Sequence, residues 1–276
     1  LRSGKPFDPF PEEKNREIIA RLAEWHFVST EQAESNLLRE GIDAKRIHRV
    51  GSTAAEATQW GALRAAPSGN TGGSEADILP ESLAELPRVA LGRQVILVTV
   101  GRRENWGDGV TAVAGALRSA LQTTPDLCVV WPVHPHPRVQ RAVYAAFDSL
   151  PRDLAQRVFL CEPLHYPALV SVLKRAWLTM TDSGGLQDEA VSLRVPVFVL
   201  REATDRPELI ASGAGVMVGC NTRVILDKLA TLRSGETLHR RMRQSAQALG
   251  DGQASDRIAR VLASIVAAPD LQVENA

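Results

Sequence analysis

The stretch that decides the fold is WLTMTDSGGLQDEA, residues 177–190. An apolar segment gives way here to an acid, a hydroxyl and two glycines, and then to a segment of helical composition. An apolar run without polar alternation is typical of a strand covered on both faces, and a glycine-containing turn is a common way for such a strand to enter a helix. We therefore predict a buried strand at 177–183 and a helix at 184–193.

The same unit recurs between residues 93 and 233. Six short apolar runs lack polar alternation: 94–100, 127–133, 158–164, 177–183, 195–200 and 215–219. Helical stretches lie between or after them at 110–122, 138–148, 166–176, 184–193 and 222–233. This alternation predicts an α/β fold with a doubly wound parallel sheet.

Residues 13–65 repeat the pattern less completely. Strands are expected within 26–30 and 46–52, with helices at 12–24, 31–40 and 53–65. Two strands are too few for a self-sufficient layered domain. Because the chain opens at Leu1 and not at methionine, we expect this block to be the trailing half of a domain in a longer protein.

These patterns predict four segments. Residues 1–65 are the trailing part of an amino-terminal Rossmann-like domain, and residues 66–92, rich in Pro, Gly, Ser and acids, are a linker. Residues 93–233 form the carboxyl-terminal Rossmann-like domain. Residues 234–276 supply terminal helices that pack back toward the first domain.

Bulk composition excludes several classes of protein. The 32 basic and 32 acidic residues balance, so no basic surface indicates nucleic-acid binding. No run approaches the ~18 apolar residues of a membrane span, and no signal peptide opens the chain. Cys128, Cys161 and Cys220 are odd in number and lie mostly in apolar runs, which indicates core residues and neither a disulfide framework nor a metal site. We expect a cytoplasmic protein without nucleic-acid or membrane partners.

Polar segments follow the predicted strands, where open parallel sheets bind ligands. In the segment DSGG (182–185), Ser183 can donate its hydroxyl, and Gly184 and Gly185 can present backbone N–H groups to a phosphate at a helix N-terminus. Glu189 lies within reach of a ribose placed behind that phosphate. An equally weighted alternative is a helix capped by Ser183, with its acids favoured by the positive end of the helix dipole.

The other polar segments are weaker signals. Arg102 and Arg103 in GRRENWGDG (101–109) suit bidentate phosphate contacts, but Arg103 and Glu104 can also form an ordinary surface pair. Arg206 in REATDRPE (201–208) suits an anion, although Asp205 can pair with a neighbour.

Two further groups carry little signal alone. His134 and His136 alternate, so their side chains should diverge in an extended segment, and no acids stand beside them to make a zinc site. Glu12 and Glu13 begin a helix, where acids are favoured by the dipole, and the local sequence supplies no second cue for catalysis.

Taken together, these stretches resemble the non-hydrolysing UDP-N-acetylglucosamine 2-epimerases of bacteria. The resemblance runs in order through LRSG (1–4), PFPEEKNR (9–16), TEQAESNLLREGI (30–42), VGSTAAEA (50–57), RREN (102–105), PVHPHP (132–137), EPLHY (162–166), TDSGGLQDEA (181–190), REATDRPE (201–208) and GDGQAS (250–255). It covers almost the whole chain apart from the linker.

The resemblance implies a fold of the GT-B type, with two Rossmann-like, doubly wound parallel-sheet domains of which the first is incomplete here. It implies an isomerase of cell-surface polysaccharide biosynthesis that converts UDP-GlcNAc to UDP-ManNAc. In that reaction UDP is eliminated to leave a 2-acetamidoglucal, and is then added again on the other face. The resemblance further implies UDP-GlcNAc and UDP as ligands, no cofactor, no metal, and a homodimer.

The resemblance also assigns roles to positions. Glu12 matches a catalytic carboxylate. The substrate-binding positions are Leu164 and Leu169 at the uracil, Ser183, Gly184 and Gly185 at the diphosphate, Glu189 at the ribose, and Arg206 at the nucleotide.

Departures from the family pattern bear on activity. Gly101 stands where the family has a histidine that contacts the diphosphate, Leu169 replaces a phenylalanine whose ring contact is worth roughly 1 kcal/mol, and Ser52 replaces an asparagine. Two further family carboxylates would precede Leu1. We therefore expect a fragment with impaired activity. The alternatives are a non-catalytic UDP-sugar-binding protein and a hydrolysing relative that acts on a UDP-sugar.

Overall fold

The computed structural model describes residues 2–5, 7, 10–64, 78–245 and 251–267. The chain divides into two compact units, Leu1–Ala57 with Leu249–Ala276, and Thr58–Ala248. This division falls inside helix α3 (Thr53–Arg64), earlier than the linker composition predicts. Residues 66–77 of the expected linker lie outside the described residues, whereas the rest of it carries two short helices, η3 (Glu81–Leu83) and α4 (Leu86–Val89), with Leu83 and Leu86 fully buried.

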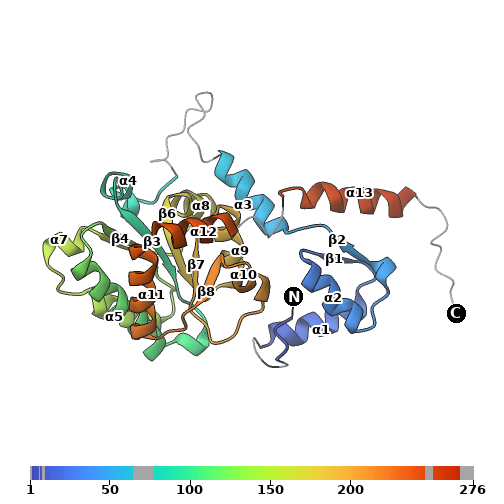
Figure 1. The fold of residues 1–276 in the computed structure, drawn as a ribbon, viewed down its shortest axis with the longest axis horizontal. Helices are drawn as coiled ribbons and strands as arrows, with labels where there is room; N and C mark the ends of the chain where they lie inside the picture. Colours follow the sequence, from blue (N-terminus) through green and yellow to red (C-terminus); the bar gives the residue numbers. More distant parts are fainter. Residues whose placement is uncertain (1, 6, 8–9, 65–77, 246–250, 268–276) are drawn as a thin grey trace. The chain divides into compact units, whose positions relative to one another are not determined.

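The larger unit is built on a six-stranded sheet (Figure 1). Its strands are β3 (Gln94–Thr99), β4 (Leu127–Pro132), β5 (Val158–Cys161), β6 (Ala176–Thr181), β7 (Val197–Val199) and β8 (Gly215–Met217). They pair in the order β5-β4-β3-β6-β7-β8, and every pair is parallel. Each strand falls on a predicted apolar run, which confirms the α/β fold with a parallel sheet. The strand order reverses between β3 and β6.

Helices cover both faces of this sheet. Successive residues of β3 point to opposite faces: Ile96 and Val98 belong to a core cluster shared with α5 (Asp108–Thr123) and α11 (Thr222–Ser234), whereas Val95 and Leu97 are buried outside that cluster. α6 (Pro137–Phe147) packs on α5, while α8 (Tyr166–Arg175) contacts β3 and β6, and α9 (Gly184–Ser192) contacts β6 and β7. The absence of polar alternation in the sequence is explained by this double cover.

Three other short or peripheral helices complete the larger unit: α7 (Arg152–Ala155), α10 (Pro207–Ala211) and α12 (Glu236–Ser245). A one-turn helix, η4 (Arg103–Asn105), follows β3. The predicted helices at 110–122, 138–148, 166–176, 184–193 and 222–233 are thus all present, displaced by two residues or fewer at either end.

The smaller unit has a parallel pair of strands, β1 (His26–Val28) and β2 (Ile47–Arg49). Its helices include α1 (Glu12–Leu22), α2 (Glu31–Arg39) and α13 (Ala254–Ala267), with a short turn, η1 (Ala44–Arg46), before β2. A cluster of six residues forms its core: Ala20, Val28, Ala33, Leu37, Ile42 and Ile47. The backbone N–H of Ser255 donates to the Glu56 carboxylate at 2.7 Å, so α13 is joined to this unit by hydrogen bonds.

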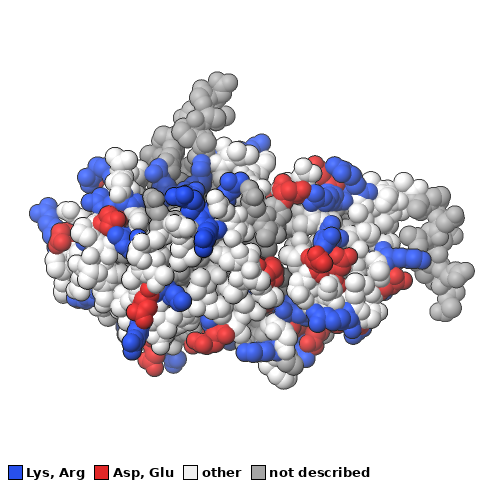
Figure 2. All heavy atoms as spheres, in the orientation of Figure 1, with Lys and Arg blue, Asp and Glu red and all other residues white. Residues whose placement is uncertain are grey.

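Charged side chains of both signs occur over each unit on the face drawn in Figure 2, in keeping with the balanced composition. Within the described residues, no helix is both long and apolar enough to cross a membrane.

Candidate functional site

A hollow of about 460 Å³ opens at the carboxyl ends of the central strands of the larger unit. It lies where the strand order reverses, which is the position at which open α/β sheets bind ligands. Residues from the ends of β3, β4, β5 and β6 and one residue of α8 form its wall: Thr99, Val100, Gly101, Arg102, Pro132, His134, Pro163, Leu164, Leu169, Asp182 and Ser183. The topology thus brings together segments that the sequence separates by about 80 residues.

Ser183 connects β6 to α9 and lines this hollow. It is the N-cap of α9, but its Oγ accepts from the Leu186 N–H at 3.5 Å, which is a long and weak hydrogen bond. The first N–H groups of a helix have no partner within it, and those of Gly184 and Gly185 begin α9 beside the hollow. The structure is therefore compatible with both a helix cap and a phosphate site at DSGG, because Ser183 caps the helix through the N–H of Leu186 and leaves those of Gly184 and Gly185 for a ligand.

Arg206 packs against Gly184. A Cβ atom on Gly184 would overlap Nη1 of Arg206, so a glycine at this position is what allows the guanidinium to approach the start of α9. No such constraint applies to the exposed Gly185, where an added Cβ meets nothing within 4 Å. The approach of Arg206 therefore requires a glycine at position 184, whereas the space around position 185 would accept a side chain.

Acids surround the buried guanidinium of Arg206. Its Nε lies 2.7 Å from Oδ1 of Asp188, and its Nη1 lies 3.0 Å from Oδ1 of Asp205. Burial opposes ionisation of Arg206, but the bonds to these two acids raise its pKa above the ordinary value. Asp205 also lies 3.5 Å from Nη1 of Arg201, so the alternative in which Asp205 pairs with neighbours is confirmed. Arg206 stands next to the hollow at the start of α9 but is not part of its wall.

Glu189 lies half-buried on the second turn of α9. Burial, and then the neighbouring charge of Asp188, raise the pKa of its carboxyl above the usual range for glutamate. Leu164 and Leu169, both half-buried, form an apolar part of the wall of the hollow. The structure thus places Leu164, Leu169 and Ser183 in the wall, and Gly184, Gly185, Glu189 and Arg206 along α9 and its start.

Asp182 is a site residue that sequence reasoning did not assign. Its carboxylate is 2% exposed and accepts from the backbone N–H of Gly101 at 3.0 Å, from that of Arg102 at 2.9 Å, and from Nδ2 of Asn105 at 2.9 Å. Burial raises the pKa of Asp182, while these donated hydrogen bonds oppose the rise. The only signal in the sequence was an acid at the very end of an apolar strand. Its function is to fix the loop after β3 against β6.

Two histidines meet one tryptophan at the edge of the hollow. The ring of His136 stacks on Trp106 with centroids 3.7 Å apart, and the ring of His134 lies 6.1 Å from the same indole. The expectation that these histidines diverge applied to an extended segment, whereas the chain bends at residues 135 and 136 and both rings lie near Trp106. Trp106 Nε1 also donates to the carbonyl of Gly101 at 2.9 Å within the loop after β3, so the stacking of His136 on Trp106 joins this loop to the one after β4.

The nearest cation to Glu104 among the described ion pairs belongs to Arg201 and not to Arg103, the partner that the alternative interpretation of the sequence gave it. Oε1 of Glu104 lies 3.9 Å from Nε of Arg201, at the outer limit of an ion pair. Arg103 is exposed on η4, whereas Arg102 contributes to the wall of the hollow. Of the two arginines, only Arg102 is therefore positioned to contact a ligand there.

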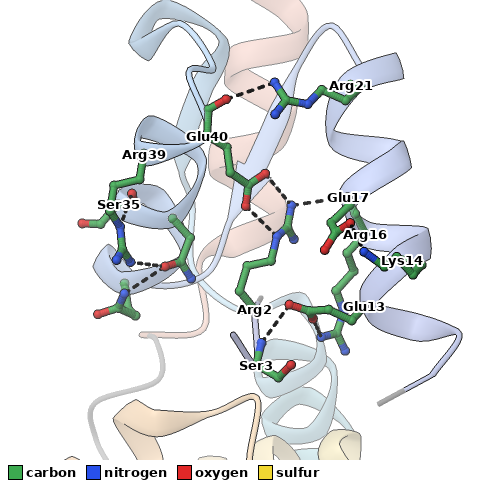
Figure 3. Close-up of polar contacts among 12 residues, drawn as sticks. Arg2, Ser3, Glu13, Lys14, Arg16, Glu17, Arg21, Ser35, Arg39 and Glu40 are labelled. Carbon is green, nitrogen blue, oxygen red and sulfur yellow. Dashed lines mark hydrogen bonds and ion pairs between the residues drawn. The ribbon is translucent and has the colours of Figure 1, made fainter. Parts of the chain in front are cut away.

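Glu12 belongs to the smaller unit, where it is half-buried as the first residue of α1. The hydrogen-bonding network around α1 is drawn in Figure 3. Glu13, buried to 2% exposure, accepts from the Ser3 N–H at 3.0 Å and from Nη1 of Arg16 at 3.1 Å, while Arg2 donates two hydrogen bonds to Glu40. Glu13 therefore does more than interact favourably with the helix dipole, because its hydrogen bond to Ser3 holds the segment before α1 in place.

Ser52 accepts from the Ala55 N–H at 3.2 Å and so caps α3. The three cysteines carry free thiols whose pKa burial raises to about 12, so none is poised as a nucleophile. In the described part of the chain no group of three or more His, Cys, Asp or Glu side chains is arranged to hold a metal ion.

Comparison with known proteins connects this geometry to a family. Residues 1–263 match the family model for UDP-N-acetylglucosamine 2-epimerase. The chain is 37% identical over 265 residues to the UDP-N-acetylglucosamine 2-epimerase of Salmonella typhimurium, covering 96% of this chain and 67% of the relative.

Solved structures give the same result. The UDP-GlcNAc 2-epimerase of Neisseria meningitidis bound to UDP-GlcNAc superposes with a TM-score of 0.85 at 30% identity, covering 96% of this chain and 68% of that one. S. aureus MnaA, solved with UDP, superposes with a TM-score of 0.82 at 31% identity, covering 96% and 67%. The chain spans about two thirds of the length of the relatives it matches.

Proposed function

The chain belongs to the UDP-N-acetylglucosamine 2-epimerase family, whose members are isomerases with a GT-B-like α/β fold, and we propose that its hollow binds the UDP portion of UDP-GlcNAc for inversion at C2. The observation that carries the proposal is the position of the hollow. It lies at the reversal of strand order, beside a helix N-terminus with free donors. Diphosphates are bound at such helix ends because the dipole and the N–H groups favour negative charge.

Each predicted ligand contact has a place in this proposal. Leu164 and Leu169 bind the uracil through the apolar part of the wall. The diphosphate accepts from the hydroxyl of Ser183 and from the N–H groups of Gly184 and Gly185. Glu189 accepts from a ribose hydroxyl.

Arg206 supports the nucleotide at the start of α9. Its charge is largely balanced by Asp188 and Asp205, so its contribution is to hold the first turn of α9 in a fixed position more than to add net positive charge.

The proposed reaction breaks the bond between C1 and UDP as the C2 proton leaves, and forms that bond again as a proton is added to the opposite face of C2. Departure of UDP places negative charge on its diphosphate, and the donors at the start of α9 stabilise that charge as it develops. A proton must leave C2 and return from the opposite side, which requires acid and base groups near the sugar. Glu12 is the group of this chain that we assign to that proton transfer.

We further propose that turnover by this polypeptide is impaired. About a third of the length of its relatives is not matched by this chain, and residue 101 has no side chain with which to contact the diphosphate. The expected behaviour is UDP binding with little or no epimerisation. A non-catalytic UDP-sugar-binding protein is the second candidate function, and Gly101 favours it. A hydrolysing activity on a UDP-sugar would share the elimination step.

The proposal includes a cytoplasmic setting and a homodimer. Three free thiols fit a reducing compartment. Neither nucleic acid nor a membrane is part of the proposed function.

A calorimetric titration with UDP and with UDP-GlcNAc tests the proposal. The Ser183→Ala, Glu189→Ala double variant removes one hydroxyl and one carboxylate from the proposed site, and we expect it to abolish measurable binding. A matched control, Ser234→Ala with Glu85→Ala, changes the same residue types at exposed positions of the larger unit, and should bind as the unmodified chain does. Equal binding by both double variants would place the nucleotide elsewhere.

A further inference from the structure

A second hollow of about 440 Å³ adjoins the one at the reversal of strand order, and Pro163 and Leu164 are part of both walls. The second hollow is surrounded by η3, α6, the end of β5 and the start of α8, all of which belong to the larger unit. It is almost as large as the first hollow. Of the proposed nucleotide contacts only Leu164 borders it, so its chemistry calls for a separate explanation.

The carboxylates of the second hollow have no cation beside them. Glu81 of η3 and Glu162, directly after β5, line the hollow, and no lysine or arginine belongs to its wall. Both glutamates are exposed, and neither takes part in an ion pair with another described residue. Because a concave wall with charge of one sign attracts ions of the opposite sign, the wall favours a cation as the occupant.

The arrangement of the donor atoms favours an extended cation over a metal ion. Glu81, Glu162 and His165 line the hollow, and so does Cys161. Nevertheless, among the described residues no three His, Cys, Asp or Glu side chains are arranged to hold a metal ion. Nδ1 of His165 already accepts from the Ala168 N–H at 3.2 Å. The donors therefore surround the hollow without meeting at one point.

The remainder of the wall is suited to an aliphatic chain. Leu160 and Leu164 contribute half-buried apolar side chains, and Tyr144 of α6 contributes a ring that is 48% exposed. An apolar wall stabilises methylene groups by removing them from water, and the face of an aromatic ring attracts an ammonium group. Cys161, 4% exposed, has a free thiol that makes no hydrogen bond within the described part of the chain, and it adds a polarizable sulfur.

We propose that the second hollow is a binding site for an aliphatic diamine or polyamine, with ammonium groups at Glu81 and Glu162 and methylene groups against Leu160 and Leu164. Hydrogen bonds from an ammonium group to a carboxylate are stronger than those between neutral groups. This site goes beyond the proposed nucleotide site and does not depend on it.

The first test measures binding of 1,5-diaminopentane and of spermidine by ligand-observed NMR at low ionic strength. We expect saturable binding of both amines and no binding of 1,5-pentanediol, which has the same chain length without the charges. Glu81→Gln with Glu162→Gln should weaken amine binding at least about tenfold. The matched control, Glu85→Gln with Glu104→Gln, removes the same number of charges at exposed positions outside the wall and should bind as the unmodified chain does.

Three outcomes of this test would overturn the proposal. The first is the absence of saturable amine binding by the unmodified chain. Equal weakening in the two double variants would show that the amines respond only to the overall charge of the protein. Binding of 1,5-pentanediol as strong as that of the diamine would show that the hollow does not select cations.

The second test examines the aromatic wall and the location of the site. Tyr144→Phe keeps the ring and should bind the diamine within about twofold of the unmodified chain, whereas Tyr144→Leu should weaken binding about threefold or more. Equal binding by these two variants would contradict the contact with the ring. The Ser183→Ala, Glu189→Ala double variant should bind the diamine normally, so amine binding and nucleotide binding are judged separately. Loss of diamine binding in that variant would place the amine in the nucleotide hollow.

Discussion

At the scale of single residues, two residues of the same type near the start of α9 make different contacts and therefore have different functions in the site. Gly184 and Gly185 are adjacent, yet only Gly184 faces a guanidinium. Asp182 and Asp188 both have a pKa raised by burial, but Asp182 receives backbone and amide N–H donors whereas Asp188 pairs with Arg206. The sequence predicted the two glycines as one phosphate-binding motif and did not assign Asp182, and the structure separates these residues by their contacts.

Gly184→Ala and Gly185→Ala form a matched pair of substitutions. Because the added methyl group overlaps Arg206 only at residue 184, we expect Gly184→Ala to lower the free energy of unfolding by about 1–3 kcal/mol. Gly185→Ala should raise it by about 0.4–1 kcal/mol, since alanine lowers the entropy of the unfolded chain. Urea denaturation of both variants measures this, and a similar change in the two would contradict the role assigned to Arg206.

Asp182→Ala tests the anchoring of the loop after β3. The substitution leaves the N–H groups of Gly101 and Arg102 and the amide of Asn105 without their acceptor, and we expect a loss of about 2–4 kcal/mol in the free energy of unfolding. Asp227→Ala, at an exposed position on α11, is the control and should change stability by less than about 0.5 kcal/mol. A loss no larger than that of the control would show that the loop is held by other contacts.

At the scale of secondary-structure elements, the strands were predictable and the contacts of the terminal helices were not. Continuous apolar runs predicted all six strands of the larger sheet, because burial on both faces removes polar alternation. Nothing in the sequence of α12 indicated how it packs. There His239 stacks on Trp177 with ring centroids 4.9 Å apart, and its Nε2 lies 2.8 Å from the Trp177 carbonyl oxygen. Such long-range contacts leave no periodic signal in the chain.

The packing of α12 predicts a dependence of stability on pH. Burial, with a smaller contribution from Arg243, lowers the pKa of His239 below the usual 6.5, although the Trp177 carbonyl opposes this. Below about pH 6.5 the unfolded chain therefore takes up a proton that the folded protein resists, so the free energy of unfolding falls as the pH is lowered. His239→Phe keeps an aromatic ring and should reduce the slope between pH 7 and pH 5.

The control for this experiment is Leu238→Ala, which changes a partly exposed neighbour and leaves the histidine in place. It should keep the slope of the unmodified chain. His26, whose pKa burial and Arg46 also lower, accounts for part of the slope that remains in His239→Phe. An unchanged slope in His239→Phe would mean that His239 is not coupled to folding.

At the scale of the whole molecule, the two units differ in the size of their cores. The larger unit has a cluster built from most of its strands and helices, whereas the described core cluster of the smaller unit has six residues, beside a two-stranded sheet. On α1 of the smaller unit, Ile18, Ile19 and Leu22 are exposed to 57%, 60% and 79%. Less apolar burial gives lower local stability.

Amide hydrogen exchange reports this difference directly. We expect the amides of β3, β4 and β6 to exchange at least about a hundredfold more slowly than those of β1 and β2, because the smaller core opens at a lower free energy. Equal protection of the two sheets would show that the units unfold together, which would contradict the independent cores described above.

The location of the site was also predictable at this scale, because polar segments after parallel strands converge wherever the strand order reverses. The stacking of His136 on Trp106 was not predictable, since it depends on a distance between two loops. A crystal structure of the chain with UDP tests the central claim most directly. The account predicts the diphosphate on the hydroxyl of Ser183 and the N–H groups of Gly184 and Gly185, and the uracil against Leu164 and Leu169. UDP bound outside the hollow at the ends of β3, β4, β5 and β6, or an empty hollow at saturating UDP, would contradict it.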